Sequence, residues 1–330
     1  MKKILVIDHE KTFITKSFEL VKDYKVEIIY NKKTNFYFRF IEKVFVKLRI
    51  PIDFNFFNKR VLKKVKNLLP DLVIIVGQTS NNRIYHSTLK KIKKLKNIKI
   101  FSWTPDNMIK KHNTSYFFDK SIPLFDIHFT TKSNIVQQLY KKDARKVVFL
   151  NQAYSKYDHY PEPYDKEYDY DILFIGTGEK ERYDTMCYLA HNGFKVDIFG
   201  NSWEKFPTIE NLKIHRKPLN GHLYRKAISS SKINLCFLRK LNDDIQTARS
   251  IEIPACRGFM LAEMTDEHSK LFKENSEAAF FSSNQDLLYK IKHYLKNKEK
   301  RKKISHNGYE KVTKFNFSYD DVVIRILSKF

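Results

Sequence analysis

The sequence predicts an α/β protein made of two Rossmann-like, doubly wound domains. Short apolar runs typical of buried parallel strands alternate with segments whose apolar residues recur at helical spacing. The alternation breaks at 154–170, where Pro161 and Pro163 stand among tyrosines and acidic residues, and then starts again. With 330 residues, the chain is also longer than one ordinary core requires. Two domains joined near residue 160 are therefore expected.

The first domain is expected at 1–160, the second at 161–315, and a final helix at 316–330 that returns to the first domain. In the first domain, strands are predicted at 3–8, 26–30, 70–77, 98–103, 125–130 and 146–150, and helices at 12–24 and 88–96. In the second, strands are predicted at 171–176, 195–200, 233–238 and 258–263, and helices at 182–191, 286–296 and 300–312. Because such sheets bind ligands beyond the carboxyl ends of their strands, a ligand cleft between the two domains is expected.

The composition indicates an anionic partner but does not say which kind. The formal net charge of +25 predicts attraction to nucleic acid, anionic lipid or phosphorylated substrates, although lysines on solvated helix faces account for part of it. The three cysteines, Cys187, Cys236 and Cys256, lack metal-ligand spacing and indicate a reducing compartment. No apolar run approaches the roughly 20 residues that span a bilayer, and no signal peptide is indicated, so a cytoplasmic protein is expected.

Residues 171–182 predict a strand, a glycine-containing turn and a helix. Gly176 and Gly178 would let the backbone approach a ligand, and Lys180 and Arg182 could neutralise phosphate. The segment lacks the Walker A ending and the third glycine of the dinucleotide fingerprint, so neither an ATPase nor an NAD enzyme is indicated. The alternative is a plain turn between strand and helix.

A second candidate segment, 243–258, places Glu252 on a short predicted helix just after several polar residues. A carboxylate there could accept hydrogen bonds from both hydroxyls of a ribose, and Arg249, one turn earlier, could face the same cleft. The alternative is an i, i+3 surface ion pair between Arg249 and Glu252.

The stretch RSIEIPACRGFMLAE at 249–263, together with DILFIGTGEKERYDTMCYLAHNGFKVDIFGNSWEK at 171–205, resembles the C-terminal half of CgeB-like glycosyltransferases. These are named for a spore maturation protein and related to glycosyltransferase family 4. PDLVIIVG and FSWTPDN extend a weaker similarity into the N-terminal half, so that it covers nearly the whole chain. The resemblance implies a GT-B fold that binds a nucleotide-sugar in the C-terminal domain and the acceptor mainly in the N-terminal one.

The resemblance also implies roles for particular residues. Glu252 is similar to the second acidic residue of the family 4 E-x7-E motif, which holds the donor ribose. Asp244 stands at the first acidic position, departs from glutamate, and is a candidate catalytic residue. Thr177 stands where the family has an arginine on the donor diphosphate. The expected donor-binding residues are Gly176, Thr177, Gly178, Lys180, Arg182, Arg249, Glu252 and Glu263.

No metal or other cofactor is expected, because arginine, lysine and helix N-termini can stabilise a departing diphosphate without one. The nucleotide-sugar would then be a co-substrate. The D-x-D pattern at 169–171 is interpreted as a chance match, since Asp171 opens a predicted strand.

In the first domain, Asp106 follows a predicted strand and is the main candidate for acceptor contact or general base. The alternative is a Pro-Asp turn in which Asp106 caps a helix. Asp8 and His112 are weaker candidates for the base.

Residues 31–66 interleave aromatic and basic side chains, a pattern compatible with core packing, nucleic-acid binding or an anionic membrane surface. The leading hypothesis is a glycosyltransferase moving a sugar from a nucleotide-sugar to a cell-surface polysaccharide, glycolipid or protein, at the inner face of the cytoplasmic membrane if the acceptor is lipid-linked. The alternatives are a basic nucleic-acid-binding protein and a catalytically silent GT-B module that binds a glycan or partner.

Overall fold

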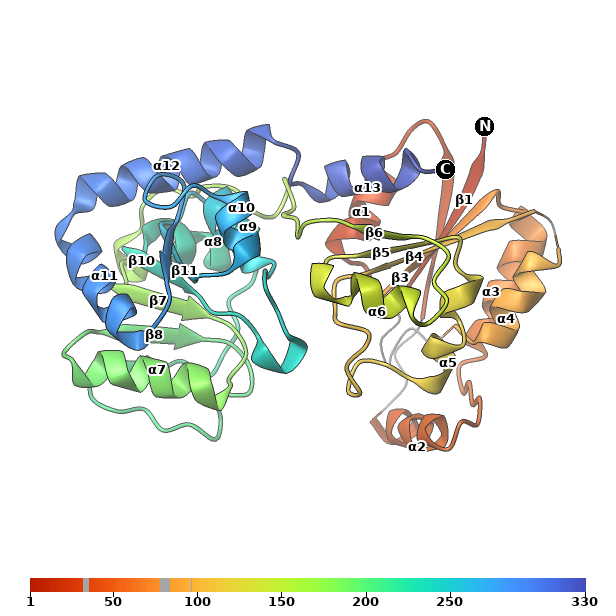
Figure 1. The fold of residues 1–330 in the computed structure, drawn as a ribbon, viewed down its shortest axis with the longest axis horizontal. Helices are drawn as coiled ribbons and strands as arrows, with labels where there is room; N and C mark the ends of the chain where they lie inside the picture. The colour runs from red at the N-terminus through yellow and green to blue at the C-terminus, as the bar shows by residue number, and fades with distance from the viewer. Residues whose placement is uncertain (32–35, 78–83, 96) are drawn as a thin grey trace. The chain divides into compact units, whose positions relative to one another are not determined.

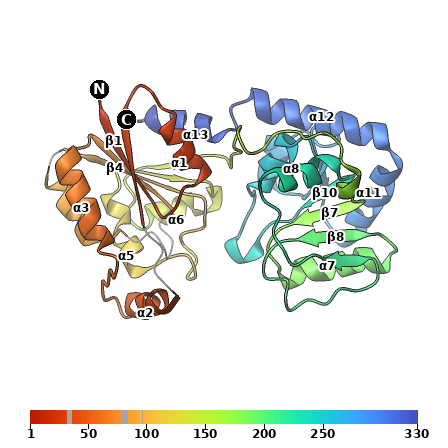
Figure 2. The ribbon, with the colours of Figure 1, turned by 180° about the vertical axis from the view of Figure 1, so that it is seen from behind.

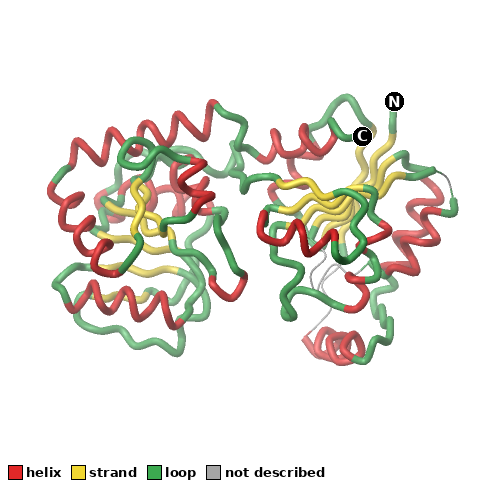
Figure 3. The backbone as a smooth tube through the Cα atoms, in the orientation of Figure 1, coloured by secondary structure: helices red, strands yellow, loops and turns green. Residues whose placement is uncertain are grey.

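The computed structural model describes residues 1–31, 36–77, 84–95 and 97–330 (Figure 1). The chain divides into unit 1, Met1–Asn151 with Tyr319–Phe330, and unit 2, Gln152–Ser318. In the described residues, each unit contains one six-stranded sheet, all of whose paired strands are parallel, flanked by helices (Figure 3). The predicted pair of Rossmann-like α/β domains is therefore confirmed. Every described helix is too short or too polar to cross a membrane.

Unit 1 has the strand order β2-β1-β3-β4-β5-β6. Its strands are β1 (Lys3–Asp8), β2 (Lys25–Tyr30), β3 (Leu72–Val76), β4 (Lys99–Thr104), β5 (Ile127–Thr130) and β6 (Val147–Phe149). Its helices are α1 (Phe13–Glu19), α2 (Phe36–Lys47), α3 (Phe57–Leu68), α4 (His86–Lys93), α5 (Tyr116–Asp119), α6 (Val136–Tyr140) and α13 (Tyr319–Leu327), with 3-10 helices η1 (Ile122–Leu124) and η2 (Ser133–Ile135). Parts of two predicted features, residues 32–35 of the aromatic-basic segment and residue 96 of the 88–96 helix, lie outside the described residues.

Alternate side chains of the unit 1 strands face opposite sides of the sheet, as the period of two requires. Leu5 and Ile7 of β1 belong to one buried cluster with Val61 of α3 and Leu89 of α4. The central strand β3 is wholly apolar, and β1 is apolar from Ile4 to Ile7, because both faces of a parallel sheet are covered, whereas the edge strand β2 carries Lys25 and Glu27. This is why they could be recognised in the sequence.

The last helix of the chain completes unit 1 (Figure 2). Ser17 Oγ on α1 donates to Asp320 Oδ1 on α13 at 2.6 Å, and the rings of Phe13 and Tyr319 lie 5.8 Å apart. The ring of Tyr319 also lies 6.4 Å from that of Trp103 at the end of β4. The return segment expected at 316–330 thus corresponds to a helix that starts at Tyr319.

Unit 2 has the strand order β12-β11-β10-β7-β8-β9. Its strands are β7 (Ile172–Ile175), β8 (Val196–Phe199), β9 (Leu212–Ile214), β10 (Ile233–Cys236), β11 (Met260–Glu263) and β12 (Ala279–Phe281). Its helices are α7 (Lys180–His191), α8 (Gly221–Ser230), α9 (Arg249–Ala255), α10 (Asp266–Leu271), α11 (Asn284–Lys296) and α12 (Lys298–Lys314), with 3-10 helices η3 (Lys166–Tyr168) and η4 (Lys240–Asn242). The strand order reverses between β7 and β10, which is the topological switch point where such sheets bind ligands.

The segment 154–170, interpreted as an interdomain linker, lies within unit 2, which begins at Gln152 and so includes residues 152–160 that were expected in the first domain. The backbone N–H of Gln152 donates to Gln246 Oε1 at 3.0 Å, and the N–H of Glu162 donates to Ser229 Oγ at 3.0 Å. Arg225 of α8 forms an ion pair with Glu162 at 2.7 Å. The segment has no apolar periodicity because polar contacts hold it on α8.

Candidate functional site

The turn after β7 is shaped by protein contacts. Trp203, fully buried, donates from Nε1 to Gly176 O at 2.8 Å. A Cβ at residue 178 would lie 2.2 Å from Ser202 O, so only glycine fits there. Gly178 therefore makes room for the loop that follows β8, whereas a Cβ at Gly176 would meet the Phe174 ring at 2.6 Å. Contact of this turn with a donor stays a prediction.

Arg182 projects from the first turn of α7 back toward the turn. Its Nη1 donates to Thr177 O at 2.9 Å, and its guanidinium lies 5.5 Å from the centre of the Phe174 ring. Burial lowers the pKa of Arg182, while Glu179, 3.7 Å away, acts in the opposite direction. Arg182 Nε is buried and has no hydrogen-bond partner among the described residues. The guanidinium is thus held in place but not fully satisfied.

A pocket of about 310 Å³ opens where β7, β10, β11 and β12 end. All its lining residues follow the carboxyl end of one of these strands or close it. They are Glu179, Glu181, Arg182, Thr185, Phe237, Leu238, Lys240, Glu263, Met264, Phe281, Ser282, Ser283 and Asn284. Of the expected donor-binding residues, Arg182 and Glu263 line this pocket. Lys240, on η4, was not predicted; the short polar run after β10 carries no motif that singles it out.

Glu263 closes β11 and faces the pocket. Its Oε1 accepts the Leu238 N–H at 3.1 Å, which holds the carboxylate next to the end of β10. Burial raises the pKa of Glu263, and nearby Lys240 and Arg182 partly oppose that rise. The pocket therefore combines three carboxylates, Glu179, Glu181 and Glu263, with two cationic side chains, Arg182 and Lys240.

Arg249 and Glu252 lie on α9 but do not form the i, i+3 ion pair considered above. Glu252 Oε2 accepts the Tyr224 hydroxyl at 3.0 Å, and its Oε1 lies 3.8 Å from His159 Nε2. Burial and the nearby Glu252 carboxylate raise the pKa of Tyr224. Arg249 Nε is buried without a hydrogen-bond partner among the described residues, and Arg249 and Arg182 are close enough to disfavour each other's charge.

Two other expected residues point elsewhere or serve local structure. Lys180 pairs with Asp184 at 2.7 Å along the exposed side of α7, and it does not line the pocket. Asp244 Oδ1 accepts an amide proton from Asn242 at 2.7 Å. Asp169 and Asp171, the D-x-D pair, both precede β7, at the edge of the sheet opposite the pocket. No three His, Cys, Asp or Glu side chains in the described parts of the chain gather as a metal-binding group.

In unit 1, Asp106 lies in a bend just after β4, where its backbone carbonyl accepts the Thr104 hydroxyl at 3.3 Å. The alternative in which Asp106 caps a helix is wrong, because the chain from 105 to 113 forms bends and turns. His112 is exposed in the same stretch.

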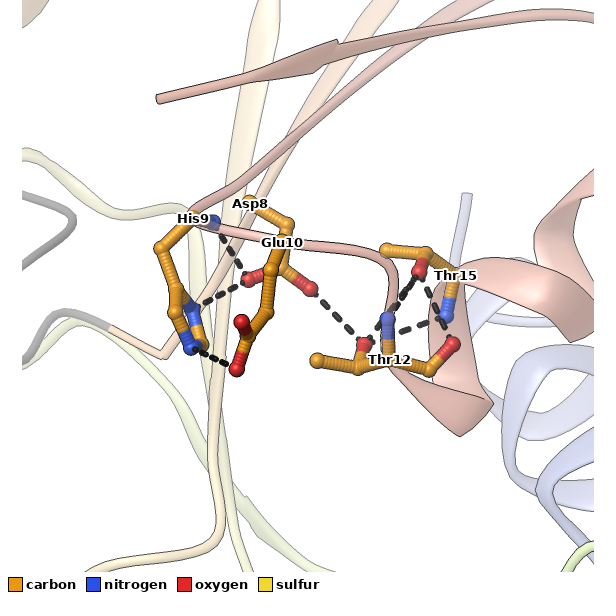
Figure 4. Close-up of polar contacts among 5 residues, drawn as sticks. All are labelled: Asp8, His9, Glu10, Thr12 and Thr15. Carbon is orange, nitrogen blue, oxygen red and sulfur yellow. Dashed lines mark hydrogen bonds and ion pairs between the residues drawn. The ribbon is translucent and has the colours of Figure 1, made fainter. Parts of the chain in front are cut away.

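Asp8 ends β1 and is fully buried (Figure 4). Its Oδ1 accepts the His9 N–H at 2.6 Å and contacts His9 Nδ1 at 2.8 Å, and its Oδ2 accepts the Thr12 hydroxyl at 2.8 Å. His9 Nε2 lies 3.3 Å from Glu10 Oε1, and these two carboxylates, Asp8 foremost, raise the pKa of His9. Asp8 thus shapes the turn, and His9 is the more exposed group. His9 was not predicted as a site residue. The signal that could have identified it is the Asp-His pair at the end of the first strand.

Comparison with solved structures identifies the fold. Anabaena Alr3699/HepE in complex with UDP and glucose matches with a TM-score of 0.69 at 10% identity, over 100% of both chains. Sucrose-phosphate synthase from Thermosynechococcus elongatus matches with a TM-score of 0.68 at 10% identity, over 100% of this chain and 98% of that one. A putative UDP-N-acetylglucosamine 2-epimerase from Listeria monocytogenes matches with a TM-score of 0.56 at 12% identity, over 99% and 95%. The expected GT-B fold is confirmed, but such identities establish the fold alone.

Sequence comparison adds the class of the C-terminal part. Residues 182–328 match the family described as glycosyl transferase-like. No curated protein matches the chain by sequence. The matched segment contains most of unit 2, including β10, β11 and α9. The C-terminal part of the chain is therefore similar to glycosyl transferase-like proteins, and this similarity supports the predicted enzyme class, a glycosyltransferase.

The geometry around His9 makes a prediction about its titration. Proton-detected NMR of the histidine rings should give His9 a pKa above 6.5 and His128, buried and desolvated, a pKa of about 4. Because the folded pKa of His9 is raised, its contribution to stability should be full below pH 6.5 and lost as pH rises through the folded value. In Asp8→Asn the pKa of His9 should fall, while that of His128 should not change. A His9 pKa that ignores this substitution would contradict the assignment.

Proposed function

We propose that the protein transfers a sugar from a nucleotide-sugar donor, with the nucleotide bound at the carboxyl-end edge of the unit 2 sheet. The main support is the pocket beside the β7/β10 switch point, most of which lies within the glycosyl transferase-like segment. HepE, whose fold is similar, was crystallised with UDP and glucose. The finer resemblance to CgeB-like and family 4 enzymes is part of the same proposal.

Arg182 and Arg249 are proposed to face the donor diphosphate. Each has a buried Nε without a hydrogen-bond partner among the described residues, and each destabilises the other's charge. Leaving buried donors unpaired costs about 1–3 kcal/mol each, more for charged groups. A diphosphate would satisfy both guanidinium groups and remove their repulsion. They would replace the arginine that the family has where this chain has Thr177.

Glu252 is proposed to hold the donor ribose. Its carboxylate keeps acceptor capacity beyond the hydrogen bond from Tyr224, and that hydroxyl fixes its orientation. Glu263 offers a second carboxylate within the pocket itself. Asp244 and the glycine turn at 176–178 remain proposed donor contacts on the strength of the resemblance.

The transfer is proposed to need no metal, because the arginines supply the charge that stabilises the leaving diphosphate. For removal of the acceptor proton, Asp106 and His9 are proposed, both following strand ends of unit 1. His9 fits this role better, since its imidazole is oriented by Asp8, which also raises its pKa.

The acceptor is proposed to be lipid-linked and reached at an anionic membrane. Helix α2 is anchored through Val46, which packs with Tyr85 and Phe117. An outward stripe, here called the α2 stripe, consists of the exposed apolar residues Tyr37, Phe40, Val44 and Leu48. These positions recur at helical spacing, and the exposed Lys43 and Lys47 adjoin them. Apolar side chains beside lysines are the composition of interfacial helices.

Nucleotide binding tests the donor site. Isothermal titration with UDP, GDP, ADP and dTDP should show saturable binding of at least one of them, about tenfold or more weaker in Glu252→Gln because a charged hydrogen-bond acceptor is lost. Arg249→Gln should weaken the diphosphate but leave the parent nucleoside unaffected. Glu204→Gln, an exposed carboxylate outside the pocket, serves as the control.

Two outcomes would overturn the donor assignment: no nucleotide binds, or Glu252→Gln and Glu204→Gln behave alike.

Sugar release from the cognate nucleotide-sugar should persist in EDTA, and its loss would contradict metal independence. Conversion of the donor to an epimer without an acceptor would indicate an epimerase, and binding without turnover would indicate a silent module.

Vesicle flotation tests the membrane proposal. The protein should bind phosphatidylglycerol-containing vesicles and not pure phosphatidylcholine, and Phe40→Ser with Leu48→Ser should weaken binding about tenfold or more through lost apolar burial. The matched control is Tyr289→Ser with Leu241→Ser, two exposed apolar residues of unit 2. Equal loss in both pairs would contradict a specific α2 surface. Single-stranded RNA that competes with the vesicles for the α2 stripe would favour the nucleic-acid alternative.

A further inference from the structure

Unit 2 contains a second cavity, of about 540 Å³, at the opposite edge of its sheet. Its walls come from the residues just before β10 and β11, from the start of α12 and from the segment before β7. The lining residues are Tyr164, Asp169, Ser229, Ser230, Ser231, Lys232, Arg257, Phe259, Lys298, Arg301, Lys302 and Ser305. Because all strands of the sheet run parallel, this basic pocket lies at the amino ends while the proposed donor pocket lies at the carboxyl ends.

The basic pocket has a strong excess of positive charge. Five of its side chains are cationic and only Asp169 is acidic. Lys232 is neutralised by Asp171 at 2.5 Å, and Lys302 meets the exposed Glu299 at 3.2 Å. Among the described residues, Arg257, Lys298 and Arg301 have no carboxylate within ion-pair distance.

Arg301 makes the excess costly, because it is only 9% exposed. Its Nη1 donates to the carbonyls of Tyr294 and Leu295, which are dipoles and not counter-ions. Burial accordingly lowers the pKa of Arg301. A desolvated guanidinium without a paired anion is unfavourable unless a ligand supplies the charge.

Helix α12 adds to the imbalance. Its first six residues, KEKRKK, carry five cations and one carboxylate at the helix end that already bears positive partial charge. The capping residue Asn297 makes no side-chain cap hydrogen bond. Cations at a helix N-terminus destabilise the helix. Without a bound anion, the start of α12 is therefore electrostatically unfavourable. An anion bound there would reverse the sign of this effect.

The remaining walls suit a phosphorylated organic molecule more than a bare ion. Ser230 Oγ accepts the Asp165 N–H at 2.9 Å, which leaves its own proton available to a ligand oxygen. Phe259 is buried in the wall, and the exposed Tyr164 stands at the rim with its hydroxyl on Asp169. The cavity volume is in the range of small-molecule sites.

We propose that the basic pocket binds a small molecule carrying a phosphate monoester or pyrophosphate group, separately from the donor site. The proposal does not rest on the proposed function, since it uses none of the donor-site residues. Lys298, Lys302 and Arg257 contact the phosphoryl oxygens, and Arg301 provides the buried charge behind them.

The test uses inorganic pyrophosphate and a local reporter. Arg257 Nη2 lies 3.0 Å from His306 Nδ1, so the His306 ring resonance should shift saturably with pyrophosphate at constant ionic strength. In Lys298→Gln with Lys302→Gln, the midpoint concentration should rise about tenfold or more, because two charge-assisted hydrogen bonds are lost. The matched control is Lys292→Gln with Lys296→Gln, exposed lysines of α11 outside the pocket, with an expected change of less than about twofold. Circular dichroism verifies that both pairs fold.

Three results would overturn the proposal: no saturable shift at His306, equal weakening in the two lysine pairs, or tighter binding of single-stranded RNA than of pyrophosphate at the same residues. A hexose phosphate that produces the same shift supports a free phosphorylated metabolite. A shift produced by phosphatidic acid vesicles but not by soluble phosphate compounds would contradict a small-molecule ligand.

Discussion

The packed turn between β7 and α7 is the constraint on which the proposed donor edge depends. Trp203 holds Gly176 O by a 2.8 Å hydrogen bond, and Gly178 leaves no room for a side chain against Ser202. With the turn fixed, Thr177 O stands where it accepts from Arg182 Nη1. The Arg182 guanidinium thus has a defined position at the switch point of the sheet, although burial disfavours its charge.

Both edges of the unit 2 sheet contain buried arginine side chains whose positive charge is incompletely compensated. At the carboxyl ends, Arg182 and Arg249 each have a buried Nε without a hydrogen-bond partner among the described residues. At the amino ends, Arg301 is buried against carbonyl dipoles, and the start of α12 is densely cationic. The net charge of +25 is therefore not only a matter of solvated lysines. Part of it is concentrated where phosphate groups would offset the cost.

The sequence predicted those parts of the fold in which burial leaves a continuous apolar run. β1, β3 and β7 are of this kind, and each was predicted within two residues of its observed ends. β9 and β12 have three residues each, too few for a period to be visible, and both were missed. The segment 154–170 was interpreted as a linker because its attachment to α8 uses polar contacts, which leave no periodic pattern. Arg182 was predicted because it follows a strand and a glycine turn, and Glu263 because it ends the stretch that resembles the family, whereas Lys240 and His9 follow strands without a recognised motif.

Hydrogen exchange measured with and without the nucleoside diphosphate that binds most tightly tests the central claim most directly. If the nucleotide binds at the carboxyl-end edge of unit 2, exchange should slow in peptides covering 176–182 and 237–263, because these segments form the turn, the pocket wall and α9. Slowing confined to unit 1 or to the start of α12, with none in those two segments, would contradict the account.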